Sequence, residues 1–110
     1  MMKFLKTILL VFFAHNAYAG EWSDWFTISR IFVSSASNMH FRVGGMESID
    51  DCTNGKTWAY VNESDSGASA KISTLLSAHA AGKNVRLYVS PTDVYGNGKV
   101  YCHVVELQVK

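Results

Sequence analysis

Two cysteines, Cys52 and Cys102, lie fifty residues apart in a chain of only 110. In an oxidising compartment an even cysteine count predicts a disulfide, and the alternative is two free thiols. In the chain-entropy model a bridge that closes a loop of this length contributes roughly 4 kcal/mol. If the chain leaves the cytoplasm, we therefore expect a Cys52–Cys102 disulfide that ties its middle to its end.

The first residues predict export. Lys3 and Lys6 form a short positive region, an apolar run extends from Ile8 to Ala14, and Ala17-Tyr18-Ala19 has the small-x-small pattern of a signal-peptidase site. A membrane anchor is the alternative, but the run has roughly half of the ~20 apolar residues that span a bilayer. We expect a signal peptide over residues 1–19 and cleavage near Ala19. The mature protein is then secreted or periplasmic, without membrane insertion.

Cleavage leaves one domain, residues 20–110, with eight basic against nine acidic residues. Binding by phosphate neutralisation needs clustered lysines and arginines, so this balance argues against nucleic acid as a partner. It argues equally against a polybasic patch for membrane surfaces.

Five strands and one helix are predicted along this domain. Period-two alternation of β-branched and aromatic residues marks the strands, and Pro91 is expected to stop the fourth. In chain order the predicted elements are strands Trp25–Val33, Met39–Val43 and Thr57–Val61, helix Ala68–Ala81, and strands Asn84–Ser90 and Val100–Val109.

The helix has two distinct faces. Its apolar face is predicted to contain Ala68, Ile72, Leu75, Leu76 and His79. Its other side is a stripe of small residues, namely Ser66, Ala70, Ser73, Ser77 and Ala80. Ser64, Asp65 or Ser66 offers an N-cap, and Gly82 is placed to end the helix. A nearly uncharged stripe suits close packing against another copy, although a serine-rich solvated face is the alternative.

The order β-β-β-α-β-β is that of the OB-fold, a five-stranded Greek-key barrel with its helix between the third and fourth strands. We therefore expect a mostly β (β+α) chain with an OB-fold-like five-stranded barrel and one disulfide. A generic α+β sandwich of the same elements is the alternative.

Three short segments stand out in the expected mature chain: the Glu21-Trp22 start, Trp58 before the helix, and the Gly82–Val89 segment after it. These segments resemble the OB-fold B subunits of bacterial AB-type toxins, those of subtilase cytotoxin and typhoid toxin. Related small secreted proteins of Gammaproteobacteria share the helix, the following strand and a cysteine-bearing loop. The chain lacks the toxin subunits' extra segments around the last strand.

The resemblance implies a ring pentamer whose helices line a central pore and which binds sialylated glycans. A serine early in the first strand of the toxin subunits contacts the sugar, and Thr27 lies nearest to it in this sequence. Thr27 is therefore a candidate binding residue by resemblance.

No catalytic or metal motif is found. His40, His79 and His103 are isolated in sequence, and no serine lies in a Gly-x-Ser-x-Gly motif. We therefore predict no enzyme activity, no metal site and no cofactor, and we expect His79 to be a packed or hydrogen-bonded core residue.

The aromatic residues are the most suggestive feature. Tyr88 alternates with inward Leu87 and Val89 and is predicted to be exposed, and Tyr95 lies in a glycine-rich loop. Exposed aromatic rings suit sugar faces or peptide segments, so Tyr88 joins Thr27 as a candidate binding residue. The sequence thus favours a non-catalytic binding module, a glycan-binding subunit of a homo-oligomer. The alternative is a monomeric periplasmic or cell-surface domain with a protein partner.

Overall fold

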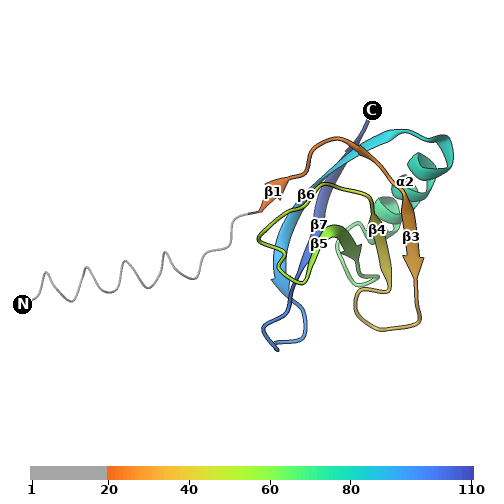
Figure 1. Cartoon of the computed structure of the whole chain (residues 1–110). Coiled ribbons are helices and arrows are strands. Elements are labelled where there is room, and N and C mark those ends of the chain that lie inside the picture. The colour runs from red at the N-terminus through yellow and green to blue at the C-terminus, as the bar shows by residue number, and fades with distance from the viewer. Residues whose placement is uncertain (1–19) are drawn as a thin grey trace, which may run out of the picture.

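Seven strands and one helix make up residues 20–110, the part of the chain that the computed structural model describes (Figure 1). The predicted signal peptide, residues 1–19, lies outside the described residues. The elements are β1 (Glu21–Trp22), β2 (Phe26–Thr27), β3 (Arg30–Val33), β4 (Phe41–Gly44), β5 (Gly55–Val61), α2 (Ala68–Ala81), β6 (Asn84–Asp93) and β7 (Val100–Val109).

All the strands belong to one sheet, in the order β1-β6-β7-β5-β4-β3, and β2 also pairs with β6. The neighbouring pairs are antiparallel except β5 and β7, which run parallel. The predicted mostly β class with a single long helix is confirmed.

The predicted closed five-stranded barrel is wrong, because the sheet is open and has more strands. The strand expected over Trp25–Val33 is interrupted at Ile28 and Ser29, so that β2 pairs with β6 whereas β3 pairs with β4. A close approach explains the break. Gly45 has a φ of 116°, and a Cβ there would lie 2.7 Å from the Ser29 hydroxyl, so the two backbones meet where only glycine fits.

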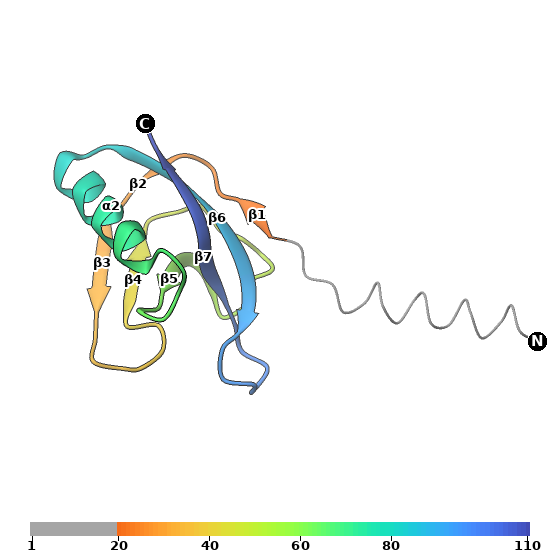
Figure 2. The same cartoon turned by 180° about the vertical axis from the view of Figure 1, so that it is seen from behind.

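The core lies between the inner face of the sheet and α2. In Figures 1 and 2 the helix lies beside the sheet, between β3 and the second half of β7. From the helix, Ala68, Leu75 and Ala78 are buried. The buried strand residues that they join include Phe26, Phe41, Val43, Ala59, Val61, Val85, Leu87, Val89, Cys102 and Val104.

The helix has the predicted bounds, and Gly82 ends it with a φ of 65° as expected. Its predicted apolar face is only partly right, because Leu76 is 45 % exposed and Ala78 is buried instead. The small Ala78 side chain lets the helix approach the sheet closely. No side chain caps the N-terminus, where Gly67 is the N-cap residue.

Two irregularities modify the last strands. A bulge lies between the pairs Tyr88–Glu106 and Val89–Val104, and it leaves Val105 as the extra residue, so the predicted alternation along β7 changes phase there. Pro91 does not stop β6, which was predicted to end at Ser90 and continues to Asp93. Beyond Val89 only β7 pairs with β6, so a residue without an N–H is tolerated on the open side.

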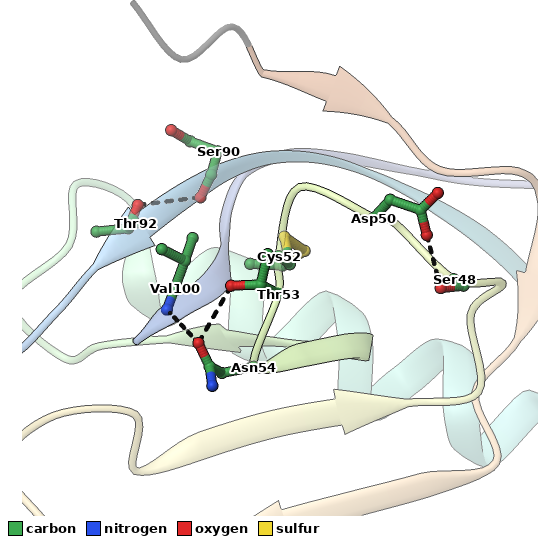
Figure 3. The surroundings of a disulfide bond; sticks show 9 residues. Ser48, Asp50, Cys52, Thr53, Asn54, Ser90, Thr92 and Val100 are labelled. Atoms are coloured by element: carbon green, nitrogen blue, oxygen red, sulfur yellow. Dashed lines mark hydrogen bonds between the residues drawn. A yellow bond between two sulfur atoms is a disulfide. The ribbon is translucent and has the colours of Figure 1, made fainter. Parts of the chain in front are cut away.

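The predicted disulfide between Cys52 and Cys102 is present, and both cysteines are fully buried (Figure 3). Asn54 reinforces it, because its backbone N–H donates to the Val100 carbonyl (3.0 Å) and its side-chain oxygen accepts from the Val100 N–H (2.9 Å). The loop before β5 is thus fastened to the start of β7. Within residues 20–110 no helix is long and apolar enough to cross a membrane.

Candidate binding site

A shallow hollow of about 190 Å³ opens over strands β3, β4 and β5. It is lined by Arg30, Phe32, Arg42, Val43, Gly44 and Trp58. Alternation along the strands explains most of this set, because Arg30 and Phe32 are two apart on β3 and stand opposite Gly44 and Arg42 on β4. Gly44 in turn pairs with Trp58. Having no side chain, it leaves open space between Arg30 and the indole.

Arg42 is held in place by three groups. Its Nε donates a hydrogen bond to the Met39 carbonyl at 2.9 Å. Its Cζ lies 4.3 Å from the centre of the Phe32 ring and 4.9 Å from that of Trp58. Cation–π contacts on two sides and a backbone hydrogen bond restrict the guanidinium group before any ligand arrives.

Trp58 is positioned by its own strand and by β7. A Cβ added at Gly55 would lie 2.7 Å from the Trp58 ring, so the indole packs directly against the Gly55 backbone. The Tyr101 ring centre lies 5.3 Å from that of Trp58. Contacts with Gly55 and Tyr101 therefore fix the position of the indole ring that borders the hollow.

No carboxylate lines the hollow, so its charge is positive. The ion pairs found within residues 20–110 are His40–Glu63, Lys56–Asp50 and His103–Asp65, and none includes Arg30 or Arg42. Two guanidinium groups without an acidic partner beside two aromatic rings can bind an anionic group next to a flat, weakly polar surface.

A second stack of aromatic and cationic side chains lies on the outward side of β6. The Arg86 Cζ is 4.5 Å from the Trp22 ring and 5.3 Å from the Trp25 ring, and its Nε donates to Gln108. This stack joins the N-terminal segment to β6 and β7. It does not line the hollow.

The two predicted binding residues lie along this side of β6 and not in the hollow. Thr27 is exposed, and its hydroxyl donates to the Asn84 side-chain oxygen at 2.8 Å. Tyr88 is half-buried, with its ring centre 5.3 Å from that of Trp22, which corrects the prediction of an exposed ring. Because Thr27 pairs with Asn84, it lies about 13 Å along the strand from Tyr88, so the structure does not bring the two together.

Sequence reasoning missed Arg30, Phe32 and Arg42. The available signal was an arginine and a phenylalanine at period two, followed on the next strand by a second arginine. This pattern predicts that the three side chains share a face only once the register of the hairpin is known. Tyr95, which was predicted to be exposed, is exposed.

A polar network lies at the loop before the helix. The Asp65 carboxylate accepts from the Asn62 N–H at 2.8 Å and lies 2.7 Å from the His103 Nε2, while the His103 ring stacks on Tyr60 at 4.8 Å. Tyr60 is only 2 % exposed, and burial is the main cause that raises its pKa to about 12. These contacts fasten the Asn62–Gly67 loop to β7.

No group of three or more metal-ligating side chains occurs in the described part of the chain. His79 is exposed, which corrects its expected place in the core, although its Nδ1 lies 3.1 Å from the Ile28 carbonyl oxygen. Comparisons with models of protein families, with curated proteins and with solved structures gave no significant match.

Proposed function

We propose that this protein is a secreted or periplasmic, non-catalytic binding module, and that its hollow holds a carbohydrate with an acidic group. A single observation carries the proposal. Arg42 is clamped between Phe32 and Trp58, with Arg30 beside it, and neither arginine pairs with a carboxylate of the described chain.

The two kinds of side chain have separate roles in this proposal. The arginines bind the carboxylate of the ligand, because a guanidinium group matches the geometry of a carboxylate with two parallel hydrogen bonds. The parts of the Phe32 and Trp58 rings that border the hollow beside Arg42 offer an apolar surface to the C–H groups of a sugar ring. The resemblance of short segments to glycan-binding toxin subunits supports the same class of ligand.

The proposal extends to fold and assembly. If β2 and β3 are counted as two halves of one strand, that strand has β6 and β4 as neighbours, which is the neighbour order of an OB barrel. We infer a relationship to that fold, with its first strand broken at Ile28 and Ser29. Self-association, as in the ring of the resembling subunits, belongs to the same proposal.

A matched pair of variants tests the ligand. Arg42→Gln removes the clamped cation of the hollow, whereas Arg86→Gln removes a cation held between two tryptophans elsewhere. We expect wild-type protein to bind an acidic oligosaccharide and to lose at least tenfold in affinity for its neutral, carboxyl-reduced form. We expect Arg42→Gln to lose a similar factor and Arg86→Gln to bind like wild type, by calorimetric titration. Equal binding of the acidic and neutral sugars, or equal losses in both variants, would exclude the proposal.

A protein partner is the second candidate. Phe32 is a large exposed apolar side chain at the rim of the hollow, and Val33, the next residue on β3, is exposed too. A monomeric interaction domain would bind a peptide or protein ligand through this rim and would show no preference for acidic sugars.

A further inference from the structure

The sequence contains two Asn-Gly steps, Asn54-Gly55 and Asn97-Gly98. An asparagine followed by glycine can react within its own chain, because the backbone nitrogen of the glycine can attack the side-chain carbonyl carbon of the asparagine. Glycine favours this reaction, since it has no Cβ to obstruct the attack. The structure places the two steps in very different surroundings.

The Asn97-Gly98 step lies in the exposed turn between β6 and β7, which projects from one end of the sheet (Figures 1 and 2). Gly96 and Gly98 have positive φ angles of 67° and 85°, and a Cβ added to either would meet no atom within 4 Å. Little packing therefore opposes a change of backbone shape at this step.

Asp93 places a base at the nitrogen that would attack. Its Oδ2 accepts the Gly98 N–H at 3.0 Å, and its Oδ1 accepts the Asn97 N–H at 3.1 Å. A general base must lie within hydrogen-bond reach of the proton that it removes. The Asp93 carboxylate meets this requirement in the folded chain, before any reaction begins.

The backbone also supports the carbonyl group that would be attacked. The Lys99 N–H donates to the Asn97 Oδ1 at 3.0 Å, so this side chain is folded back along the chain toward the Gly98 nitrogen. Negative charge moves onto the carbonyl oxygen when the nitrogen attacks, and a donor already aimed at that oxygen stabilises the charge. The nucleophile, the base and the oxyanion donor thus all lie within residues 93–99.

The Asn54-Gly55 step has no such base and is fixed in place. The Gly55 N–H donates to the Cys52 carbonyl oxygen at 3.0 Å, and a carbonyl oxygen is far too weak a base to take the proton. A Cβ at Gly55 would lie 2.7 Å from the Trp58 ring, so the indole obstructs movement of this backbone. Figure 3 shows the Asn54 side-chain oxygen held by the Val100 N–H. This step has a donor at its carbonyl group but lacks the base and the room to react.

We propose that Asn97 is a site of self-catalysed deamidation in the folded protein, with the Asp93 carboxylate as general base. A bond forms between the Gly98 nitrogen and the Asn97 Cγ. The bond between that carbon and the amide nitrogen breaks, and the nitrogen leaves as ammonia with the proton that Asp93 first accepted. The product is a five-membered succinimide ring. Water then adds to one of the two ring carbonyl groups, and the ring opens to aspartate or isoaspartate.

Either product changes the turn. It adds a negative charge close to Asp93, whose two oxygens accept the N–H groups of the turn, and isoaspartate also adds a methylene group to the main chain. Both changes weaken the hydrogen bonds of residues 93–99, which close the hairpin of the two longest strands. The β6–β7 hairpin therefore loosens at this end as the protein ages, independently of any ligand in the hollow.

The test compares each Asn-Gly step in the folded and in the unfolded chain. Wild-type protein is incubated at one pH and temperature in buffer and in guanidinium chloride, and peptide mapping by mass spectrometry follows aspartate and isoaspartate at both steps. We expect Asn97 to react at least about tenfold faster in the folded protein, since a positioned general base typically contributes about 100-fold or more. Asn54 should react more slowly in the folded protein than in the unfolded chain.

A matched pair of variants then tests the base. Asp93→Asn keeps the shape of the side chain and removes the base, whereas Glu106→Gln removes an exposed carboxylate that forms no ion pair in the described chain. We expect Asp93→Asn to slow the reaction at Asn97 to the rate of the unfolded chain, and Glu106→Gln to react like wild type. A thermal melt checks that both variants fold.

Three results would overturn the proposal. They are an Asn97 rate that is no higher in folded than in unfolded wild type, folded Asp93→Asn protein that reacts as fast as wild type, and equal rates at Asn54 and Asn97 in the folded chain. If Asp93→Asn does not fold, the comparison of folded and unfolded wild type decides alone.

Discussion

Three contacts act on one guanidinium group at Arg42. The Met39 carbonyl, the Phe32 ring and the Trp58 ring restrict its rotation, so a ligand would not have to order a free side chain on binding. Gly44 leaves space that the proposed ligand would fill, since a Cβ there would meet only ordinary contacts, at 3.7 Å from the Arg30 Nε. Neighbouring Gly45 is different, since its backbone geometry and its approach to Ser29 require glycine.

The buried Tyr60 hydroxyl determines how the free energy of unfolding should respond to alkaline pH. Its pKa is raised from 10.0 to about 12 chiefly by burial, so the folded state keeps a proton that the unfolded state has lost. The unfolded state binds fewer protons in this window, and the free energy of unfolding therefore falls as pH rises from about 10 to about 12.

Urea unfolding at both ends of that window measures the effect. Tyr60→Phe should lose less stability than wild type between the two pH values, whereas Tyr95→Phe, at an exposed ring, should follow wild type. An equal fall in wild type and Tyr60→Phe would show that this hydroxyl is not the group responsible.

At the scale of the element, the helix shows which positions the core requires. Leu75 is fully buried and Leu76 is 45 % exposed, although they are neighbours. Leu75→Ala should lower the free energy of unfolding by roughly 2–5 kcal/mol, because it leaves a cavity beneath the helix. Leu76→Ala should change it by less than about 1 kcal/mol, measured by the same denaturant titration. Similar losses at both positions would mean that the helix packs on a different face.

The helix could be predicted almost fully from the sequence because its period and its terminal glycine are local signals. The prediction failed for Leu76. Helical periodicity places both Leu76 and Ala78 near the boundary of the apolar face, and only the packing against the sheet decides that the small Ala78 is buried and Leu76 is exposed. The strands could be predicted too, because the period-two alternation of their side chains is also a local signal. Their irregularities, the break at Ile28–Ser29 and the extra residue Val105, depend on neighbouring strands and could not be predicted.

At the scale of the whole molecule, the disulfide was predictable because Cys52 and Cys102 are the only two cysteines of the sequence and its first residues predict export. Whether the sheet closes could not be predicted from the sequence. It depends on which residues of the segment from Glu21 to Val33 pair with β6 and which pair with β4. The hollow depends on the same division, because Arg30 and Phe32 reach Arg42 only through the β3–β4 pairing.

The central claim is that a ligand binds in the hollow that Arg42 and Trp58 line together. The described chain contains three tryptophans, of which only Trp58 lines the hollow, whereas Trp22 and Trp25 flank Arg86. In a two-dimensional ¹H–¹⁵N NMR titration with an acidic oligosaccharide, the Trp58 indole N–H signal should shift with saturation while the other two stay in place. Shifts confined to Trp22 or Trp25, or no indole shift when the sugar binds, would contradict the account.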